Sequence, residues 1–142
     1  MIALMGRRVL VVDDEPDILD LLTMLFEDDD RCAAVAAVGE LDEAVAAAVE
    51  LEADSIVLDL MFGHRTSVEI LPSLRRARPD AHIVVFTSSR RAAMAAGVLD
   101  LGADVVVQKV SVSFEALTDL VLNPQIAIPE QRPPAPHPVN CD

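Results

Sequence analysis

The chain has 142 residues, of which 52% are apolar, and a net charge of −13. This size predicts one folded domain with an aliphatic core, because the sequence has no Trp or Tyr and only four Phe. The negative charge argues against direct binding to nucleic acid or to anionic membranes. No apolar stretch approaches the ~20 residues of a membrane span, and the N-terminus lacks the order of a signal peptide. We therefore expect a cytoplasmic protein, in which the two cysteines, Cys32 and Cys141, are reduced.

Strand-like and helix-like segments alternate five times along the chain. Short β-branched apolar runs predict strands at residues 9–12, 32–38, 55–58, 82–86 and 105–107. Apolar residues at helical spacing predict helices from residue 16 to the acidic run 27–30 and over 41–49, 68–77, 90–101 and 114–121. Pro16 fits the first turn of the first helix, Gly102 ends the fourth, and Ser113 fits the N-cap of the fifth.

This alternation predicts an α/β domain, with a doubly wound five-stranded parallel sheet and helices on both faces. In such sheets ligands bind beyond the carboxyl ends of the strands. The pattern covers residues 1–122. Residues 123–142 hold six of the nine prolines and show no apolar periodicity, so we expect a disordered or extended tail there.

Polar residues end four of the expected strands. They are Asp13 and Asp14, Asp59, Thr87 and Lys109. Lys109 is the only lysine beside ten arginines, which suggests a tight site that needs a compact ammonium group. Carboxylates that meet at one sheet edge repel one another unless a cation intervenes, and Mg²⁺ prefers oxygen ligands. A carboxylate beside Mg²⁺ can attack phosphorus, and a hydroxyl and an ammonium can hold the phosphoryl oxygens.

Helix capping is the competing interpretation of the first acidic pair. Aspartate is favoured at a helix N-terminus, and for Asp14 the two interpretations are evenly balanced. Asp59 has no such alternative, because its neighbours Leu58 and Leu60 give no turn signal.

The order and spacing of these residues resemble the receiver domain of two-component response regulators over residues 7–122. The resemblance rests on Asp13-Asp14, Asp59 in VLDLM, Thr87 in VVFTSS and Lys109 in LGADVVVQK. It implies a flavodoxin-like (βα)5 fold with strand order 2-1-3-4-5. It also implies a phosphoprotein rather than an enzyme, in which Asp59 accepts a phosphoryl group from a histidine kinase, a phosphotransfer protein or a small phosphodonor.

The resemblance extends to the other site residues and to the partners. Thr87 and Lys109 are implied to bind the phosphoryl group and to couple it to a conformational change. Signalling is then by contact with a downstream protein, with a homodimer left open. The metal ligands implied for Mg²⁺ are Asp14, Asp59 and the carbonyl of Met61, with Asp13 acting through water.

Three positions depart from the family pattern. Val106 stands where the family usually has a Tyr or Phe that swings inward, and Val110 replaces a cis proline after the lysine. A cis bond before valine costs ~3–4 kcal/mol, so we expect a loop that is strained or differently built. The loop after the acceptor, residues 62–67, lacks the usual Pro and Gly arrangement. The chemistry at Asp59 is therefore expected to be intact and the transmission altered.

Two alternatives remain open at this point. A constitutive binding module would keep the pocket without the switch, as Val106 and Val110 suggest. A Mg²⁺-dependent phosphohydrolase would also use an aspartyl phosphate, but such enzymes tend to show D-x-D after the first strand and a cap for the substrate. This sequence has Asp13-Asp14-Glu15-Pro16 there and no room for a cap.

Overall fold

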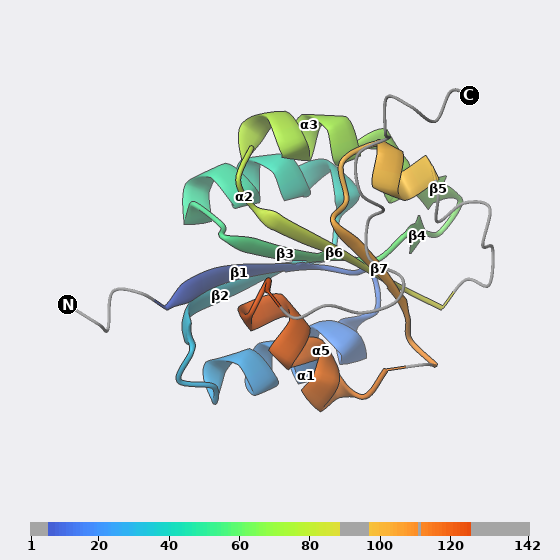
Figure 1. Cartoon of the computed structure of the whole chain (residues 1–142). Coiled ribbons are helices and arrows are strands. Elements are labelled where there is room, and N and C mark those ends of the chain that lie inside the picture. Colours follow the sequence, from blue (N-terminus) through green and yellow to red (C-terminus); the bar gives the residue numbers. More distant parts are fainter. Residues whose placement is uncertain (1–5, 89–96, 111, 126–142) are drawn as a thin grey trace, which may run out of the picture.

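The computed structural model describes residues 6–88, 97–110 and 112–125. Their centre is a five-stranded sheet with the order β2-β1-β3-β6-β7, in which every neighbouring pair is parallel (Figure 1). The predicted fold class and strand order are confirmed. The strands are β1 (Arg7–Val12), β2 (Cys32–Val38), β3 (Ser55–Leu58), β6 (His82–Thr87) and β7 (Val105–Gln108).

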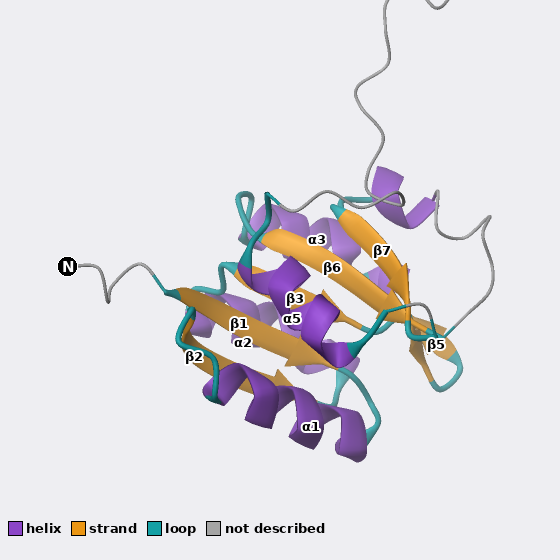
Figure 2. Cartoon of the chain, turned by 60° about the horizontal axis from the view of Figure 1, so that its bottom comes forward, coloured by secondary structure: helices purple, strands orange, loops and turns teal. Residues whose placement is uncertain are grey.

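Helices cover both faces of the sheet. α1 (Pro16–Glu27) and α5 (Phe114–Leu122) lie on one face, and α2 (Ala44–Leu51) and α3 (Leu71–Ala77) lie on the other (Figures 1 and 2). Short 3₁₀ turns, Leu41–Glu43 and Ser67–Glu69, precede α2 and α3. Residues 97–100 are also helical, whereas the first part of the helix expected over 90–101 lies outside the described residues. No helix in the described ranges is long and apolar enough to span a membrane.

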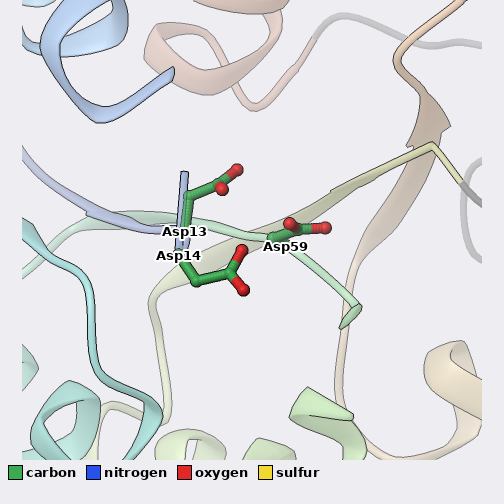
Figure 3. A group of neighbouring side chains, drawn as sticks. All are labelled: Asp13, Asp14 and Asp59. Atoms are coloured by element: carbon green, nitrogen blue, oxygen red, sulfur yellow. The ribbon is translucent and has the colours of Figure 1, made fainter. Parts of the chain in front are cut away.

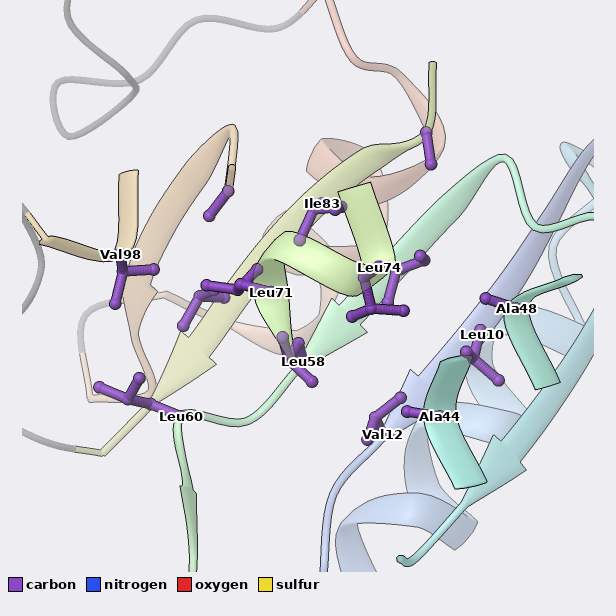
Figure 4. Close-up of a cluster of buried hydrophobic side chains, with 14 of the residues drawn as sticks. Leu10, Val12, Ala44, Ala48, Leu58, Leu60, Leu71, Leu74, Ile83 and Val98 are labelled. Carbon is purple, nitrogen blue, oxygen red and sulfur yellow. The ribbon is translucent and has the colours of Figure 1, made fainter. Parts of the chain in front are cut away.

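Alternation along the strands divides the core in two. In β1, Val9 and Val11 pack with α1 and α5, and Leu10 and Val12 pack with α2 and α3 (Figure 4). All residues of β3 and β6 are buried, which explains their uniformly apolar sequence between the polar ends. The core is aliphatic, as the composition predicts, and its two layers hold the strand ends in fixed positions.

Local signals set most of the helix ends. Pro16 occupies the first turn of α1, and the Ser113 side chain accepts a hydrogen bond from the Ala116 N–H (3.0 Å) at the start of α5. Gly102 has φ +130°, and a Cβ there would lie 3.2 Å from the Cβ of Arg75. Glycine is therefore required after helical residues 97–100.

A β-hairpin replaces the loop expected after the acceptor strand. β4 (Met61–Phe62) pairs antiparallel with β5 (Arg65–Thr66). Gly63, the first of the two loop residues, has φ +62°, as the first position of a type II′ turn requires. The sequence analysis missed this hairpin because two-residue strands are too short to show alternation. The expected tail can be followed only to Gln125, since residues 126–142 lie outside the described part of the chain.

Candidate functional site

Three acidic side chains meet at the carboxyl edge of the sheet. Asp13 and Asp14 follow β1 and Asp59 follows β3, so the parallel pairing of these two strands brings them together (Figure 3). One carboxylate oxygen from each lies within 4.8 Å of the others. Asp13 and Asp59 are buried, whereas Asp14 is exposed. This is the cluster that the sequence analysis predicted from the strand ends.

Lys109 reaches the same cluster from β7. Its Nζ lies 3.2 Å from Oδ2 of Asp13, 3.6 Å from Oδ2 of Asp59 and 3.8 Å from Oε1 of Glu15. The Lys109 ammonium also lies 5.3 Å from the ring centroid of Phe86. Burial by itself lowers the pKa of Lys109, but the charges of Asp59 and Asp13 outweigh it, and the net effect raises that pKa. The ammonium is therefore charged at neutral pH.

The carboxyl group of Asp59 is strongly perturbed. Burial and the neighbouring charge of Asp13 raise the pKa of Asp59 to about 7, against the opposing effect of Lys109. One lysine does not compensate the carboxylates that converge here. The donor set suits a divalent cation, because three carboxylates within reach of one ion are hard oxygen ligands whose repulsion the ion relieves.

The other two predicted residues lie beside this cluster. The backbone N–H of Met61 donates to Oδ1 of Asp59 (3.4 Å). Thr87 is buried at the end of β6, and its carbonyl accepts a hydrogen bond from the backbone N–H of Lys109 (2.8 Å). All six residues predicted from the sequence thus lie at one edge of the sheet. Their individual roles in binding a metal or a phosphoryl group stay predictions.

Comparison with known proteins identifies this arrangement. The family model of the response regulator receiver domain matches residues 9–122. The chain belongs to this family. The receiver is 34% identical over 97 residues to a protein-glutamate methylesterase/protein-glutamine glutaminase of Agrobacterium fabrum, a match that covers 68% of this chain and 28% of that protein. It is 32% identical over 105 residues to the DNA-binding response regulator MtrA of Mycolicibacterium smegmatis, covering 74% of this chain and 45% of MtrA.

A solved structure is similar over most of this chain. It is a response regulator protein from Burkholderia pseudomallei that carries a phosphorylated aspartic acid, a calcium ion and citrate. The two share 27% sequence identity with a TM-score of 0.73, and the match covers 82% of this chain and 66% of that one. This chain spans less than half the length of the two curated relatives named above.

The two valines that flank the lysine of this receiver have opposite environments. Val106 is buried in β7 within the core layer of α2 and α3, whereas the side chain of Val110 is 81% exposed. Every peptide bond in the described residues is trans. The peptide bond between Lys109 and Val110 is therefore trans, and the strained or differently built loop expected from the sequence stays a prediction.

Glu15 is a site residue that the sequence analysis did not single out. It is the N-cap residue of α1, and its carboxylate contacts Lys109. Only its position after the acidic pair and before Pro16 could have drawn attention to it. Which way the side chain points depends on tertiary structure.

A second polar cluster lies at the opposite, amino edge of the sheet. Arg75 of α3 makes five hydrogen bonds, which match its five N–H donors. The carbonyl of Gly102 accepts two of these bonds. The other three go to the carbonyls of Pro79 and Ala81 and to the carboxylate of Asp104. Arg75 joins α3 to the starts of β6 and β7. The sequence analysis gave it no role.

Two further residues complete the amino edge. The hydroxyl of Ser55, fully buried, accepts from Nε of Arg7 and donates to the carbonyl of Val121, both at 2.8 Å. His82 is buried, and its Nε2 has no hydrogen-bond partner. Burial lowers the pKa of His82, although the nearby charge of Asp104 opposes this shift. A hollow of about 450 Å³ opens beside these residues.

Proposed function

We propose that this receiver is a phosphoacceptor of a two-component phosphorelay. Asp59 takes the phosphoryl group, with Mg²⁺ bound by the acidic cluster, and the phosphorylated receiver signals by protein contact. The single observation that supports this most is the position of Asp59. Its buried carboxylate lies within one ion's reach of two other acids and 3.6 Å from the only lysine of the chain.

The proposed reaction is a substitution at phosphorus. A carboxylate oxygen of Asp59 attacks, and the bond between phosphorus and the leaving atom breaks. That atom is a ring nitrogen of phosphohistidine in a kinase or phosphotransfer protein, or an oxygen of acetate in acetyl phosphate. The leaving atom keeps the electron pair, and Asp59 becomes an aspartyl phosphate.

Each surrounding residue has a proposed part in this step. Asp13, Asp14, Asp59 and the carbonyl of Met61 hold Mg²⁺, with Asp13 acting through water. An ion bound there would supply positive charge beside the phosphoryl oxygens. Lys109 and Thr87 bind those oxygens by a charge-assisted hydrogen bond and a hydroxyl hydrogen bond. The phosphorylated aspartic acid and calcium ion of the B. pseudomallei relative support this assignment.

Phosphorylation with acetyl phosphate and Mg²⁺ tests the proposal directly. We expect intact-protein mass spectrometry to show one added phosphoryl mass on the wild type and none on Asp59→Asn. Asp17→Asn removes one exposed carboxylate from the first turn of α1 and should be labelled like the wild type. Equal labelling of Asp59→Asn and the wild type contradicts the proposal.

A binding module that does not respond to phosphorylation is the second candidate. The observation in its favour is Val106, an aliphatic side chain buried in β7 that cannot repeat the aromatic rotamer change of the family. Sedimentation velocity before and after phosphodonor treatment separates the two candidates. A changed sedimentation coefficient or partner affinity rejects the second candidate, and labelling without any change supports it.

A further inference from the structure

Glu15 lies where a capping residue is expected, but its side chain does not cap the helix. It is the N-cap residue of α1, with an extended backbone (φ −94°, ψ 113°) and no side-chain hydrogen bond to the first turn. Its Oε1 lies 3.8 Å from Nζ of Lys109. The Glu15 side chain thus leaves the helix N-terminus uncapped and contacts the lysine instead.

Asp13 holds the backbone of Glu15 next to the lysine. Its Oδ1 accepts a hydrogen bond from the backbone N–H of Glu15 (2.9 Å), and its Oδ2 lies 3.2 Å from Nζ of Lys109. One carboxylate thus holds the backbone of Glu15 and the ammonium of Lys109 at the same time. Pro16 restricts the backbone of Glu15 further, since its ring fixes φ directly after Glu15 and limits the conformations of the residue before it.

The three acidic partners of Lys109 differ in exposure. The side chains of Asp13 and Asp59 are 3% and 8% exposed, whereas that of Glu15 is 63% exposed. Within the described ranges, the cluster with metal-binding geometry consists of Asp13, Asp14 and Asp59 and does not include Glu15. Glu15 therefore contacts the lysine from the solvent side without belonging to the metal site.

We propose that Glu15 is a positioning residue that competes with the phosphoryl group for Lys109. This inference rests on the proposed function. Before phosphorylation, the Glu15 carboxylate shares the ammonium with Asp13 and Asp59, from the solvent side and at 3.8 Å against 3.2 and 3.6 Å. When Asp59 carries the phosphoryl group, Lys109 must exchange this contact for one with the phosphoryl oxygens. Glu15 then opposes the activated state by the free energy of its contact with Lys109.

Beryllofluoride, which imitates a phosphoryl group on aspartate, provides the test with the full chain and Mg²⁺. We expect Glu15→Gln to raise the beryllofluoride affinity about two- to fivefold, the range for one exposed ion pair. Its Mg²⁺ affinity should change by less, since Glu15 lies outside the metal cluster. Glu15→Asp keeps the charge but is one methylene shorter, and should behave like Glu15→Gln if contact with Lys109 matters.

Asp17→Asn is the matched control, because it removes the same charge two residues further on without a contact to Lys109. It should leave the affinity ratio of beryllofluoride to Mg²⁺ at the wild-type value. Lys109 is the only lysine, so ¹⁵N-lysine labelling gives one side-chain NMR signal. That signal should shift in Glu15→Gln and not in Asp17→Asn.

The failures of the two proposals are distinguishable. A wild-type protein that binds neither beryllofluoride nor a phosphoryl group contradicts the proposed function. A wild-type protein that binds both, with Glu15→Gln equal to Asp17→Asn or weaker than the wild type, overturns the role of Glu15 alone.

Discussion

The two edges of the sheet differ in how their polar side chains are paired. At the amino edge, each N–H donor of Arg75 meets an acceptor, and the hydroxyl of Ser55 both donates and accepts. At the carboxyl edge, several carboxylates share the ammonium of Lys109, and the pKa of Asp59 rises to about 7. At the first edge, Arg75 and Ser55 find their hydrogen-bond partners within the chain, whereas at the second edge the carboxylates outnumber the one ammonium group that they share.

The same strands build both edges. β3 begins with Ser55 and leads into Asp59, and β6 begins with His82 and ends with Thr87. Between these ends the strands are apolar and buried, so the two polar clusters are separated by the core. The comparison suggests that the amino edge supports stability and that the carboxyl edge gives up stability for function. Substitutions that remove a polar group should therefore lower the free energy of unfolding at the amino edge and raise it at the carboxyl edge.

The largest effect is expected from the amino edge. Arg75→Ala removes the donor to the carbonyls of Pro79, Ala81 and Gly102 and one of the donors to the Asp104 carboxylate. It should lower the free energy of unfolding by about 3 kcal/mol. Urea unfolding measures this change. Arg76→Ala, on the same helix, loses one exposed hydrogen bond to Ser73 and should cost less than about 0.5 kcal/mol. Equal costs for the two variants would remove the distinction between the edges.

At the carboxyl edge, removing a charge should stabilise the protein. The pKa of Asp59 lies near 7, above its usual 3.8, so the folded state loses stability as pH rises from about 4 to 7. Asp59→Asn should raise the free energy of unfolding at pH 8 without divalent ions by about 2 kcal/mol. This is half of the full linkage value, because water and salt ions reach the open edge.

Measuring the stability of Asp59→Asn at a second, lower pH provides the control. The gain from Asp59→Asn should shrink to a small remainder at pH 4, where Asp59 of the wild type is protonated in the folded state and about half protonated in the unfolded state, whose pKa is 3.8. A gain that is the same at pH 4 and pH 8 would point to packing rather than to charge.

Adding Mg²⁺ should reduce the difference between the edges. At ten times its dissociation constant, the ion should stabilise the wild type by about 1.4 kcal/mol, since it binds only the folded state. Thermal unfolding with and without MgCl₂, at matched ionic strength, measures this gain. Asp14→Asn removes an exposed member of the acidic cluster and should lose most of it. An undiminished gain in Asp14→Asn would contradict the ligand role of Asp14.

The smallest effect concerns His82 at the amino edge, whose Nε2 is the one buried side-chain polar atom without a hydrogen-bond partner in the described part of the chain. Burial lowers the pKa of His82, so the folded state takes up its proton less readily than the unfolded state, whose pKa is about 6.5. The contribution of His82 to stability is complete above that pH and is lost as the pH falls below it. Melting temperatures of wild type and His82→Gln, compared between pH 7.5 and 5.5, should show a steeper fall for the wild type.

Much of the fold could be predicted from local patterns. The strands Cys32–Val38 and Ser55–Leu58 have the predicted bounds, and Pro16 and Ser113 lie where the sequence placed them. The hairpin at Met61–Thr66 was missed because it depends on pairing two strands of two residues each. Arg75 was missed as well, because the carbonyls that it binds come from loops that only the folded chain brings together.

The sequence by itself determined which residues lie at the carboxyl edge, because parallel strands place whatever follows them on one side of the sheet. It also determined that the only lysine belongs to this set. The tertiary structure decided the energetic state of the set: which acids are buried, how far each lies from Lys109, and that Glu15 contacts the lysine instead of capping α1. Burial and charge pairing depend on distances across the whole fold, and no local pattern specifies them.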